Sequence, residues 1–456
     1  MNTYIPIIGL ETHVELKTNS KMFCRCSADY FGREPNTHTC PVCLGLPGAL
    51  PVPNKLAIEW CIKIALALNC EINEFSKFDR KNYFYPDLAK GYQISQYDLP
   101  FGKDGKVMLA SGKTIRIRRV HMEEDTGKLT HAGKESLVDF NRSGLPLVEI
   151  VTEPDFHDVK DVTEYLQRLQ QIVRYLEVSN ADMEKGDMRL EPNISLALTS
   201  SLRELKEGGA IPTNLLPNYK VEVKNINSFR FVEKAIAFEI TRQAELLDKG
   251  ERPAQETRGY DSVKHRTFSQ RSKEDAQDYR YFPEPDIPPI VTKKAIIEEY
   301  KKSLPELPDA KHERFMKEYA LSAIDAEILT RDRSLADYFE EAVSLCHPER
   351  AKRVEGSHTS PKAIAKWIIN KKININEVMP AAVIKQILEA KQKIEINEGE
   401  LSTIINTVIA ENEKPVAEYK AGKEPVIMFL VGQVMRKAGK KIDAQMVKEK
   451  LSKQLK

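Results

Sequence analysis

The chain has 456 residues, more than one hydrophobic core usually organises, so its length predicts two or three domains. Its residues are 41% hydrophobic and 30% charged. No apolar run approaches the roughly 20 residues that a membrane-spanning helix needs. The N-terminal residues lack the charged and apolar regions of a signal peptide, so we expect a cytoplasmic protein. The net charge of +2 does not decide on RNA binding, because a balanced total can hide a basic patch.

The chain up to about residue 292 predicts strands with a few helices between them. From Ile8 to Leu16 apolar side chains alternate with polar ones, which is the two-residue period of a half-buried strand. The same alternation predicts strands at Met188–Leu198 and Val221–Lys224. Apolar residues at helical spacing predict helices at Lys55–Leu68, Asp161–Leu176 and Phe231–Leu247. This order of elements favours an α+β domain over residues 1–292, built on a largely antiparallel sheet.

Four cysteines near the N-terminus form two close pairs, Cys24 with Cys26 and Cys40 with Cys43. Zinc prefers four soft ligands at tetrahedral corners, with Zn–S distances of about 2.3 Å, and two such pairs joined by a loop supply that geometry. The spacing predicts a structural zinc knuckle in residues 20–45, since four thiolates leave no position open for a substrate. His38 is a competing ligand by position, and four structural or free cysteines are the alternative interpretation.

The polar faces of the predicted strands carry the candidate functional residues. Glu11, His13 and Glu15 share one face of the first strand, roughly 6.5–7 Å apart pairwise. Several carboxylates converging with one imidazole suit Mg²⁺ or Mn²⁺, ions that typically bridge to ATP phosphates. A solvated sheet face whose charges pair across strands explains the pattern equally well. Other predicted strands add further candidates: Glu123, Glu124, Asp125, Glu149, Arg189 and Glu191.

The usual nucleotide-binding motifs are missing from the sequence. Gly112–Thr114 is its only Gly-Lys-Thr, and Val107 stands where a P-loop has its first glycine. Because strand-like segments flank this tripeptide, it predicts a hairpin turn. Four segments rich in aromatic, acidic and basic residues resemble binding loops. Local packing is the alternative for each of them: Phe78–Asp87, Gly91–Tyr97, Gln255–Arg258 and Asp278–Asp286.

The character of the chain changes beyond a proline-punctuated stretch at residues 283–289. We expect a helical domain over residues 293–395 and a small helical tail domain over residues 396–456. Residues 361–456 hold 18 Lys and Arg against 11 Asp and Glu. Solvated helix faces explain this excess, and a basic binding surface is the alternative. The segment 347–359 fits no helical pattern and predicts an inserted surface loop.

Several segments, in order along the chain, resemble the B subunit of the bacterial-type GatCAB aspartyl/glutamyl-tRNA(Asn/Gln) amidotransferase. In the first domain they are Ile8–Leu16, Phe78–Asp87, His121–Lys128, Val138–Arg142, Leu147–Asp155, Gln255–Arg258 and Asp278–Pro288. Ala417–Lys423 and Phe429–Met435 resemble that family's tail domain. Two features depart from the pattern: the four cysteines occur in only some members, and residues 347–359 have no counterpart.

This resemblance implies a glutamine-synthetase-like catalytic cradle, a helical domain and a tail that contacts tRNA. The implied reaction is ATP-dependent amidation of Glu-tRNA(Gln), Asp-tRNA(Asn) or both. The implied partners in a heterotrimer are an amidase (glutaminase), which supplies ammonia, and a third, small protein. The implied cofactors are ATP and Mg²⁺ or Mn²⁺, beside the structural Zn²⁺. We assign catalytic and metal-binding roles to Glu11, His13, Glu124 and Glu149, and a metal-binding role to Glu191. Our phosphate-binding candidates, chosen from strand faces, are Arg189 and Lys224.

Two other functions compete with this interpretation. One is a non-catalytic, tRNA-binding scaffold with the same fold, but Glu11, His13 and Glu124 are all present and count against it. The other is a free-standing ligase for a small amino acid, which would have no use for the basic tail.

Overall fold

The structure is a computed structural model that describes residues 4–199, 216–272, 279–346, 359–391, 398–438 and 444–455. The predicted insertion at 347–359 lies outside the described residues except for Thr359. The chain forms two compact units, residues 1–311 with 331–333 and residues 312–330 with 334–456. The division into three domains at residues 292 and 395 stays a prediction.

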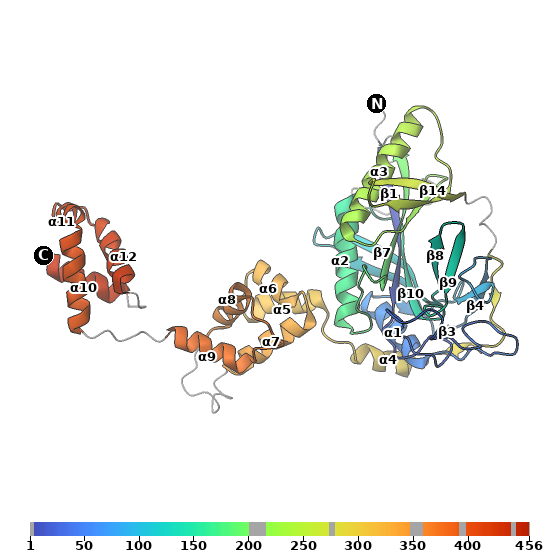
Figure 1. The fold of residues 1–456 in the computed structure, drawn as a ribbon, viewed down its shortest axis with the longest axis horizontal. Coiled ribbons are helices and arrows are strands. Elements are labelled where there is room, and N and C mark those ends of the chain that lie inside the picture. Colours follow the sequence, from blue (N-terminus) through green and yellow to red (C-terminus); the bar gives the residue numbers. More distant parts are fainter. Residues whose placement is uncertain are drawn as a thin grey trace. The chain divides into compact units, whose positions relative to one another are not determined.

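A nine-stranded sheet organises the first unit (Figure 1). Its order is β14-β13-β12-β11-β1-β10-β7-β6-β2, and every neighbouring pair is antiparallel except β12 with β13. The predicted α+β class with a largely antiparallel sheet is therefore confirmed. The strands of this sheet are β1 Tyr4–Glu15, β2 Glu71–Ile72, β6 Gly102–Met108, β7 Thr114–Glu124, β10 Pro146–Thr152, β11 Met188–Leu198, β12 Val221–Lys224, β13 Glu256–Asp261 and β14 Arg266–Ser272.

Three smaller sheets complete this unit. β4 Asp79–Asn82 lies between β15 Phe282–Pro283 and β5 Tyr92–Ser95, which places three of the four aromatic-rich segments side by side. The other two sheets are pairs: β3 Phe75–Ser76 with β16 Ile290–Val291, and β8 Lys128–Ala132 with β9 Glu135–Asp139.

Strand β1 lies in the middle of the large sheet, and its alternating side chains explain why this segment forms a strand. Its apolar residues Ile8, Leu10 and Val14 are buried in the main core. Glu11 and His13, which alternate with them, point to the opposite face of the sheet. A strand turns successive side chains to opposite sides, so one short segment serves both the core and a polar surface. The predicted strand is confirmed, and β11 and β12 have the predicted bounds.

Helices cover the apolar face of this sheet. α1 Lys55–Ala67, α2 Val159–Tyr175 and α3 Phe229–Asp248 match the three predicted helices to within two residues, and all contribute to the main core. Asn54, Asp158 and Ser228 cap their N-termini by accepting backbone N–H bonds. Figure 1 shows α2 on one side of the sheet and the β8–β9 hairpin on the other. The polar face is therefore left free of these helices.

The Gly-Lys-Thr tripeptide lies in the β6–β7 hairpin, as predicted. Gly112 has φ +82°, a left-handed conformation that glycine adopts without strain, and its N–H bonds to the Leu109 carbonyl at 2.9 Å. Thr114 already begins β7. A P-loop needs a helix to follow the glycines, so this segment has no such role.

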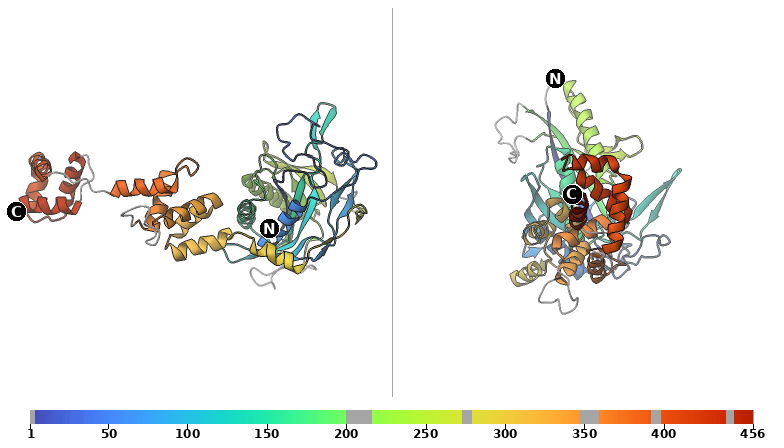
Figure 2. Two further views of the ribbon diagram at one scale, coloured as in Figure 1. Left: turned by 90° about the horizontal axis from the view of Figure 1, so that it is seen from below. Right: turned by 90° about the vertical axis from the view of Figure 1, so that its left-hand side faces the viewer.

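The described residues beyond Val291 contain helices only (Figures 1 and 2), which confirms the predicted helical character. Two separate apolar cores lie in the second unit, one within residues 315–388 and one within residues 401–455. Among the described helices, none is long and apolar enough to cross a membrane. The helices are α4 Lys294–Lys302, α5 Pro308–Glu318, α6 Ala323–Thr330, α7 Arg333–Ser344, α8 Pro361–Lys371, α9 Pro380–Lys391, α10 Glu398–Glu411, α11 Glu413–Lys420, α12 Val426–Ala438 and α13 Ala444–Leu455.

Candidate functional site

The polar face of the large sheet gathers histidines and glutamates from three neighbouring strands. In the pairing of β1 with β10, His13 lies opposite Glu149, and in the pairing of β10 with β7, Glu149 lies opposite His121. Residues directly opposite in a sheet share a face, so these three side chains form one row across the strands. Glu123 stands two residues beyond His121 and extends the same face.

Short distances join the members of this row. His13 Nε2 lies 3.3 Å from Glu123 Oε1 and 3.7 Å from Glu149 Oε2, and His121 Nε2 lies 3.1 Å from Glu149 Oε2. One ligand atom each from His13, Glu123 and Glu149 lies within 4.8 Å of the others. We call these three residues the His13 cluster. One imidazole and two carboxylates at this spacing can hold a single metal ion.

The electrostatics of the His13 cluster favour a positive charge at its centre. Burial opposes the charge on His13, but Glu191, Glu123 and Glu149 raise its pKa to about 10. Burial alone would raise the pKa of Glu149, yet His121 and His13 hold it well below its usual value. The carboxylates therefore stay ionised, and a proton on His13 supplies the compensating charge that a bound cation would also supply.

A second acidic group lies next to the first. One carboxylate oxygen each from Glu11, Glu191 and Glu222 lies within 4.8 Å of the others. Lys224 Nζ contacts Glu191 at 2.9 Å and Glu222 at 3.6 Å. Burial raises the pKa of Glu11, and its acidic neighbours add to the effect. We call Glu11, Glu191 and Glu222 the Glu11 group; it too can hold a metal ion.

His13 connects the two groups. Its Nε2 faces Glu123 and Glu149, whereas its Nδ1 lies 3.9 Å from Glu191 Oε1. That Nδ1 is buried and forms no hydrogen bond within the described residues. A cavity of about 280 Å³ lies beside Glu11 and is lined also by Arg118, Asn193 and Lys220. Through Glu11, the Glu11 group thus borders a space that a ligand can enter.

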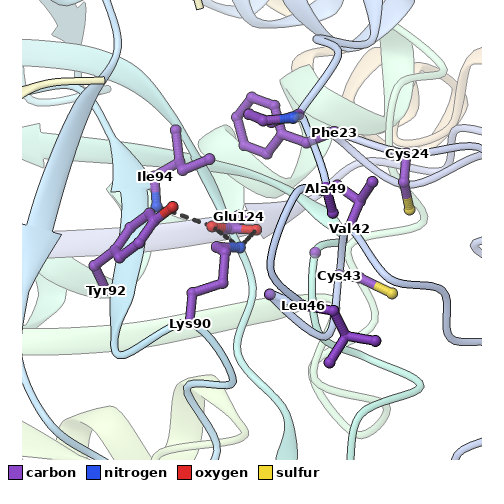
Figure 3. A pocket seen from close by; sticks show the side chains of 13 residues that line it. Phe23, Cys24, Val42, Cys43, Leu46, Ala49, Lys90, Tyr92, Ile94 and Glu124 are labelled. Carbon is purple, nitrogen blue, oxygen red and sulfur yellow. Dashed lines mark hydrogen bonds and ion pairs between the residues drawn. The ribbon is translucent and has the colours of Figure 1, made fainter. Parts of the chain in front are cut away.

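The structure separates Glu124, a predicted metal ligand, from the His13 cluster. Glu124 directly follows Glu123 and so points to the opposite face of β7, where Lys90 Nζ contacts its Oε1 at 2.6 Å and the Ile94 N–H donates to it at 2.9 Å. Figure 3 shows Lys90 and Ile94 around this carboxylate. Strand alternation therefore brings Glu123, not Glu124, to His13.

The two predicted phosphate-binding residues, Arg189 and Lys224, are paired with carboxylates. Arg189 Nη2 contacts Asp125 Oδ2 at 2.9 Å, so its charge is compensated, as is that of Lys224. Glu15, third on the face of β1, lies outside both acidic groups. Burial, together with Asp125 and Asp187, raises the pKa of Glu15 to about 8.

The four clustered cysteines converge as their spacing predicts. One sulfur from each of Cys24, Cys26, Cys40 and Cys43 lies within 4.8 Å of the others, and these four can hold a metal ion. The Cys40 N–H donates to Cys43 Sγ at 3.1 Å. Hydrogen bonding with Cys24 lowers the pKa of Cys43 to about 4, whereas burial raises the pKa of Cys26 to about 11. His38 lies outside this group.

A small cavity lies between the cysteine segment and Glu124 (Figure 3). Its volume is about 110 Å³, and its walls include Cys24, Cys43, Leu46 and Lys90. The half-buried Lys90 and the buried Glu124 form an ion pair on the wall of this cavity.

Comparisons with known proteins agree with this architecture. The family described as the GatB/GatE catalytic domain matches residues 6–298, and the family described as the GatB domain matches residues 361–455. The chain belongs to the GatB family. It is 43% identical to the B subunit of the aspartyl/glutamyl-tRNA(Asn/Gln) amidotransferase of Carboxydothermus hydrogenoformans, over 99% of this chain and 100% of that protein. The B subunits of Persephonella marina and Thermotoga neapolitana are 45% and 44% identical, over 99% of both chains in each case.

The sequence alone assigns no role to three residues on the polar face of this GatB chain. Glu123 is a candidate without a role, and neither His121 nor Glu222 stands out by itself. Two-residue alternation was the available signal, because it places His121 with Glu123 on β7 and Glu222 with Lys224 on β12. Alternation alone does not show which face of β7 lies beside His13, because that depends on how β7 pairs with β10.

Proposed function

We propose that this chain activates the side-chain carboxylate of Glu or Asp esterified to tRNA, so that Glu-tRNA(Gln), Asp-tRNA(Asn) or both become Gln-tRNA(Gln) and Asn-tRNA(Asn). The observation that supports this most directly is the pair of adjoining acidic groups on one sheet face, joined by His13. The relatives are named as B subunits of an aspartyl/glutamyl-tRNA(Asn/Gln) amidotransferase, which supports the same reaction. A glutamine-synthetase-like cradle is the corresponding proposal for the fold, and the antiparallel sheet with its acidic face supports it.

The proposed reaction has two steps. A carboxylate oxygen of the esterified amino acid attacks the γ-phosphorus of ATP, and ADP leaves. Ammonia then attacks the acyl carbon, phosphate leaves, and one proton is released from the nitrogen to give the neutral amide. The first step brings two anions together, so positive charge fixed nearby lowers its barrier.

Mg²⁺ or Mn²⁺ fits the two acidic groups by the chemistry of the donors. The His13 cluster and the Glu11 group would hold it, mostly through carboxylate oxygens, which hard cations prefer. Bound there, the ion would neutralise charge between ATP and the acceptor carboxylate. His13 must release its proton before it can serve as a ligand. His121 beside Glu149, and Lys224 beside Glu191 and Glu222, orient these carboxylates and favour their ionised form.

Zinc is our proposal for the cysteine group. Four sulfurs within 4.8 Å of one another suit a tetrahedral thiolate site. Hydrogen bonding with Cys24 lowers the pKa of Cys43, which favours the thiolate form that zinc binds. Such an ion would hold residues 20–45 in place, since this segment contains no helix or long strand of its own.

Ammonia must come from another protein in this proposal. The sequence has no Gly-Gly-Ser-Ser stretch of the kind an amidase carries. We propose that a separate amidase (glutaminase) supplies ammonia and that a third, small protein completes a heterotrimer. The relatives are named as one subunit of an amidotransferase, which supports a multi-subunit assembly.

An assay with free ammonia tests the proposed function without the partners. The purified chain, ATP, Mg²⁺, ammonium chloride and Glu-tRNA(Gln) or Asp-tRNA(Asn) should yield the amidated tRNA together with ADP. A scaffold protein would bind the tRNA without cleaving ATP, and a small-molecule ligase would cleave ATP with free glutamate. Either result would contradict the proposal.

The tail beyond residue 395 is expected to hold tRNA electrostatically. In the described part of the chain, its apolar core is built from residues 401–455, so its removal opens neither of the other cores. A chain ending at residue 395 should bind tRNA about tenfold more weakly and with a smaller salt dependence, because fewer phosphates are neutralised. Filter binding at several salt concentrations measures both effects. Unchanged tRNA affinity in a truncated chain with the wild-type melting temperature would contradict this expectation.

A further inference from the structure

Two cations border the His13 cluster without an anionic partner. They are Lys81 on β4 and Arg119 on β7. In the described parts of the chain, neither charged group takes part in a hydrogen bond or an ion pair. Three cations nearby are instead neutralised by carboxylates: Lys90 by Glu124, Arg189 by Asp125, and Lys224 by Glu191 and Glu222.

Arg119 belongs to the same face of β7 as His121 and Glu123. It lies opposite Val151 of β10, two residues from Glu149. Its Nε is buried and has no hydrogen-bond partner among the described residues. A buried guanidinium N–H without an acceptor is unfavourable, and such groups in native proteins usually meet an acceptor that the protein itself does not provide. Arg119 is therefore arranged to receive a ligand.

Lys81 is held by aromatic rings and not by carboxylates. Its Nζ lies 5.2 Å from the centroid of Tyr279 and 5.9 Å from that of Tyr83. Cation–π contacts of this kind fix an ammonium group while leaving its hydrogen-bond donors free. Burial opposes the charge, but Glu123, with Tyr281 and Glu149, raises the pKa of Lys81 well above its ordinary value. Lys81 therefore remains protonated.

Tyr281 connects the two cations to the acidic cluster. Lys81 and Arg119 both act electrostatically on its hydroxyl, as do Glu123 and Glu149, and burial is the main cause that raises its pKa to about 12. The Tyr281 ring stacks on Tyr97 at a centroid distance of 4.4 Å and an interplanar angle of 15°. The pairing of β4 with β5 places Lys81 opposite Gln93, two residues from Ser95, whose hydroxyl donates to Glu123 at 3.3 Å.

We propose that Lys81 and Arg119 together bind the terminal phosphate of a metal-bound nucleoside triphosphate. This inference rests on the proposed function and identifies the cations that would bind the γ-phosphate of ATP in that reaction. A terminal phosphate carries two negative charges and three acceptor oxygens, which match an ammonium group and a forked guanidinium. The carboxylates of the His13 cluster would repel it unless a divalent cation lay between them. A backbone phosphate of tRNA has one charge and is the weaker match.

The test is calorimetric titration of the full-length chain with MgATP and with MgADP. Lys81→Met and Arg119→Met should each weaken MgATP binding by about tenfold to hundredfold, because each removes a charged hydrogen-bond donor. MgADP lacks the terminal phosphate and should be affected much less. Lys81→Arg and Arg119→Lys keep the charge and should retain part of the affinity. Lys106→Met and Arg266→Met are matched controls, since both replace exposed cations on strands of the same sheet.

The outcomes separate this inference from the function on which it rests. If both methionine variants bind MgATP as tightly as the wild-type chain does, the inference is overturned but the proposed function is not. A wild-type chain that binds no MgATP would overturn the inference together with the ATP-dependent part of the proposed function. Variants that lose tRNA affinity in filter binding but keep MgATP affinity would assign the two cations to tRNA and overturn the inference. Equal losses for MgATP and MgADP would overturn it too, by placing the cations away from the terminal phosphate.

Discussion

His13→Ala or Glu11→Ala should abolish tRNA-dependent ATP cleavage while leaving the fold intact. Both side chains point away from the apolar face of β1, so their loss opens no cavity in the main core. Each replacement removes a candidate cation ligand, and His13→Ala also removes the side chain that links the two acidic groups. Loss of such charge stabilisation typically costs about a hundredfold or more in rate. ATP cleavage with Glu-tRNA or Asp-tRNA and free ammonia measures this chemistry without the partner proteins.

Thr12 provides the internal control for this experiment. It lies between Glu11 and His13 but is fully buried on the apolar side of β1, where its hydroxyl has no hydrogen-bond partner among the described residues. Thr12→Val keeps the shape and removes an unsatisfied polar group, so stability and ATP cleavage should both change little. A His13→Ala enzyme that turns over at the wild-type rate would exclude the proposed site.

Cys40→Ser or Cys43→Ser should release the metal from the cysteine segment and loosen residues 20–45. We expect about one zinc per chain in protein purified without chelators, and close to none in either variant, because a structural site needs all four ligands. Binding free energy at such a site is folding free energy, so local order should fall with the metal. Metal analysis measures the first effect and hydrogen exchange of the segment measures the second.

Cys346→Ser is the control for this loss. Cys346 lies in the second unit, far along the chain from the four clustered sulfurs, and its replacement should leave the zinc content unchanged. Protein that contains no zinc after chelator-free purification would remove the zinc proposal. Full zinc retention in Cys43→Ser would remove Cys43 from the ligand set.

The features that could be predicted from the sequence are those with a local cause. The alternation in β1 separates Glu11 and His13 from the core by itself, and the bounds of β11 follow from the same rule. The convergence of the four cysteines is also local, since a short loop between two close pairs leaves the sulfurs few other arrangements. Helix α2 follows from apolar spacing, although it begins two residues before the predicted start, after its Asp158 cap.

The features that escaped prediction depend on contacts between distant segments. Glu123 and Glu124 are chemically identical neighbours, and only the pairing of β7 with β10 decides which of them reaches His13. That pairing includes an irregularity near Arg119, where the register shifts by one residue. The pairing of Arg189 with Asp125 likewise joins residues 64 positions apart. Strand alternation can be predicted from one segment of the sequence. Which charges pair in the folded site cannot, because the partners come from different segments.

The position of His13 between two acidic groups has a thermodynamic consequence. An imidazole nitrogen that coordinates a cation carries no proton, so a cation at Nε2 would fix the tautomer with its proton on Nδ1, which faces Glu191. Occupancy of the His13 cluster would then alter the charge that the Glu11 group experiences. By linkage, a cation in the Glu11 group must alter affinity at the His13 cluster by the same factor. The two acidic groups would therefore fill as a coupled pair, with His13 as the element that transmits the coupling.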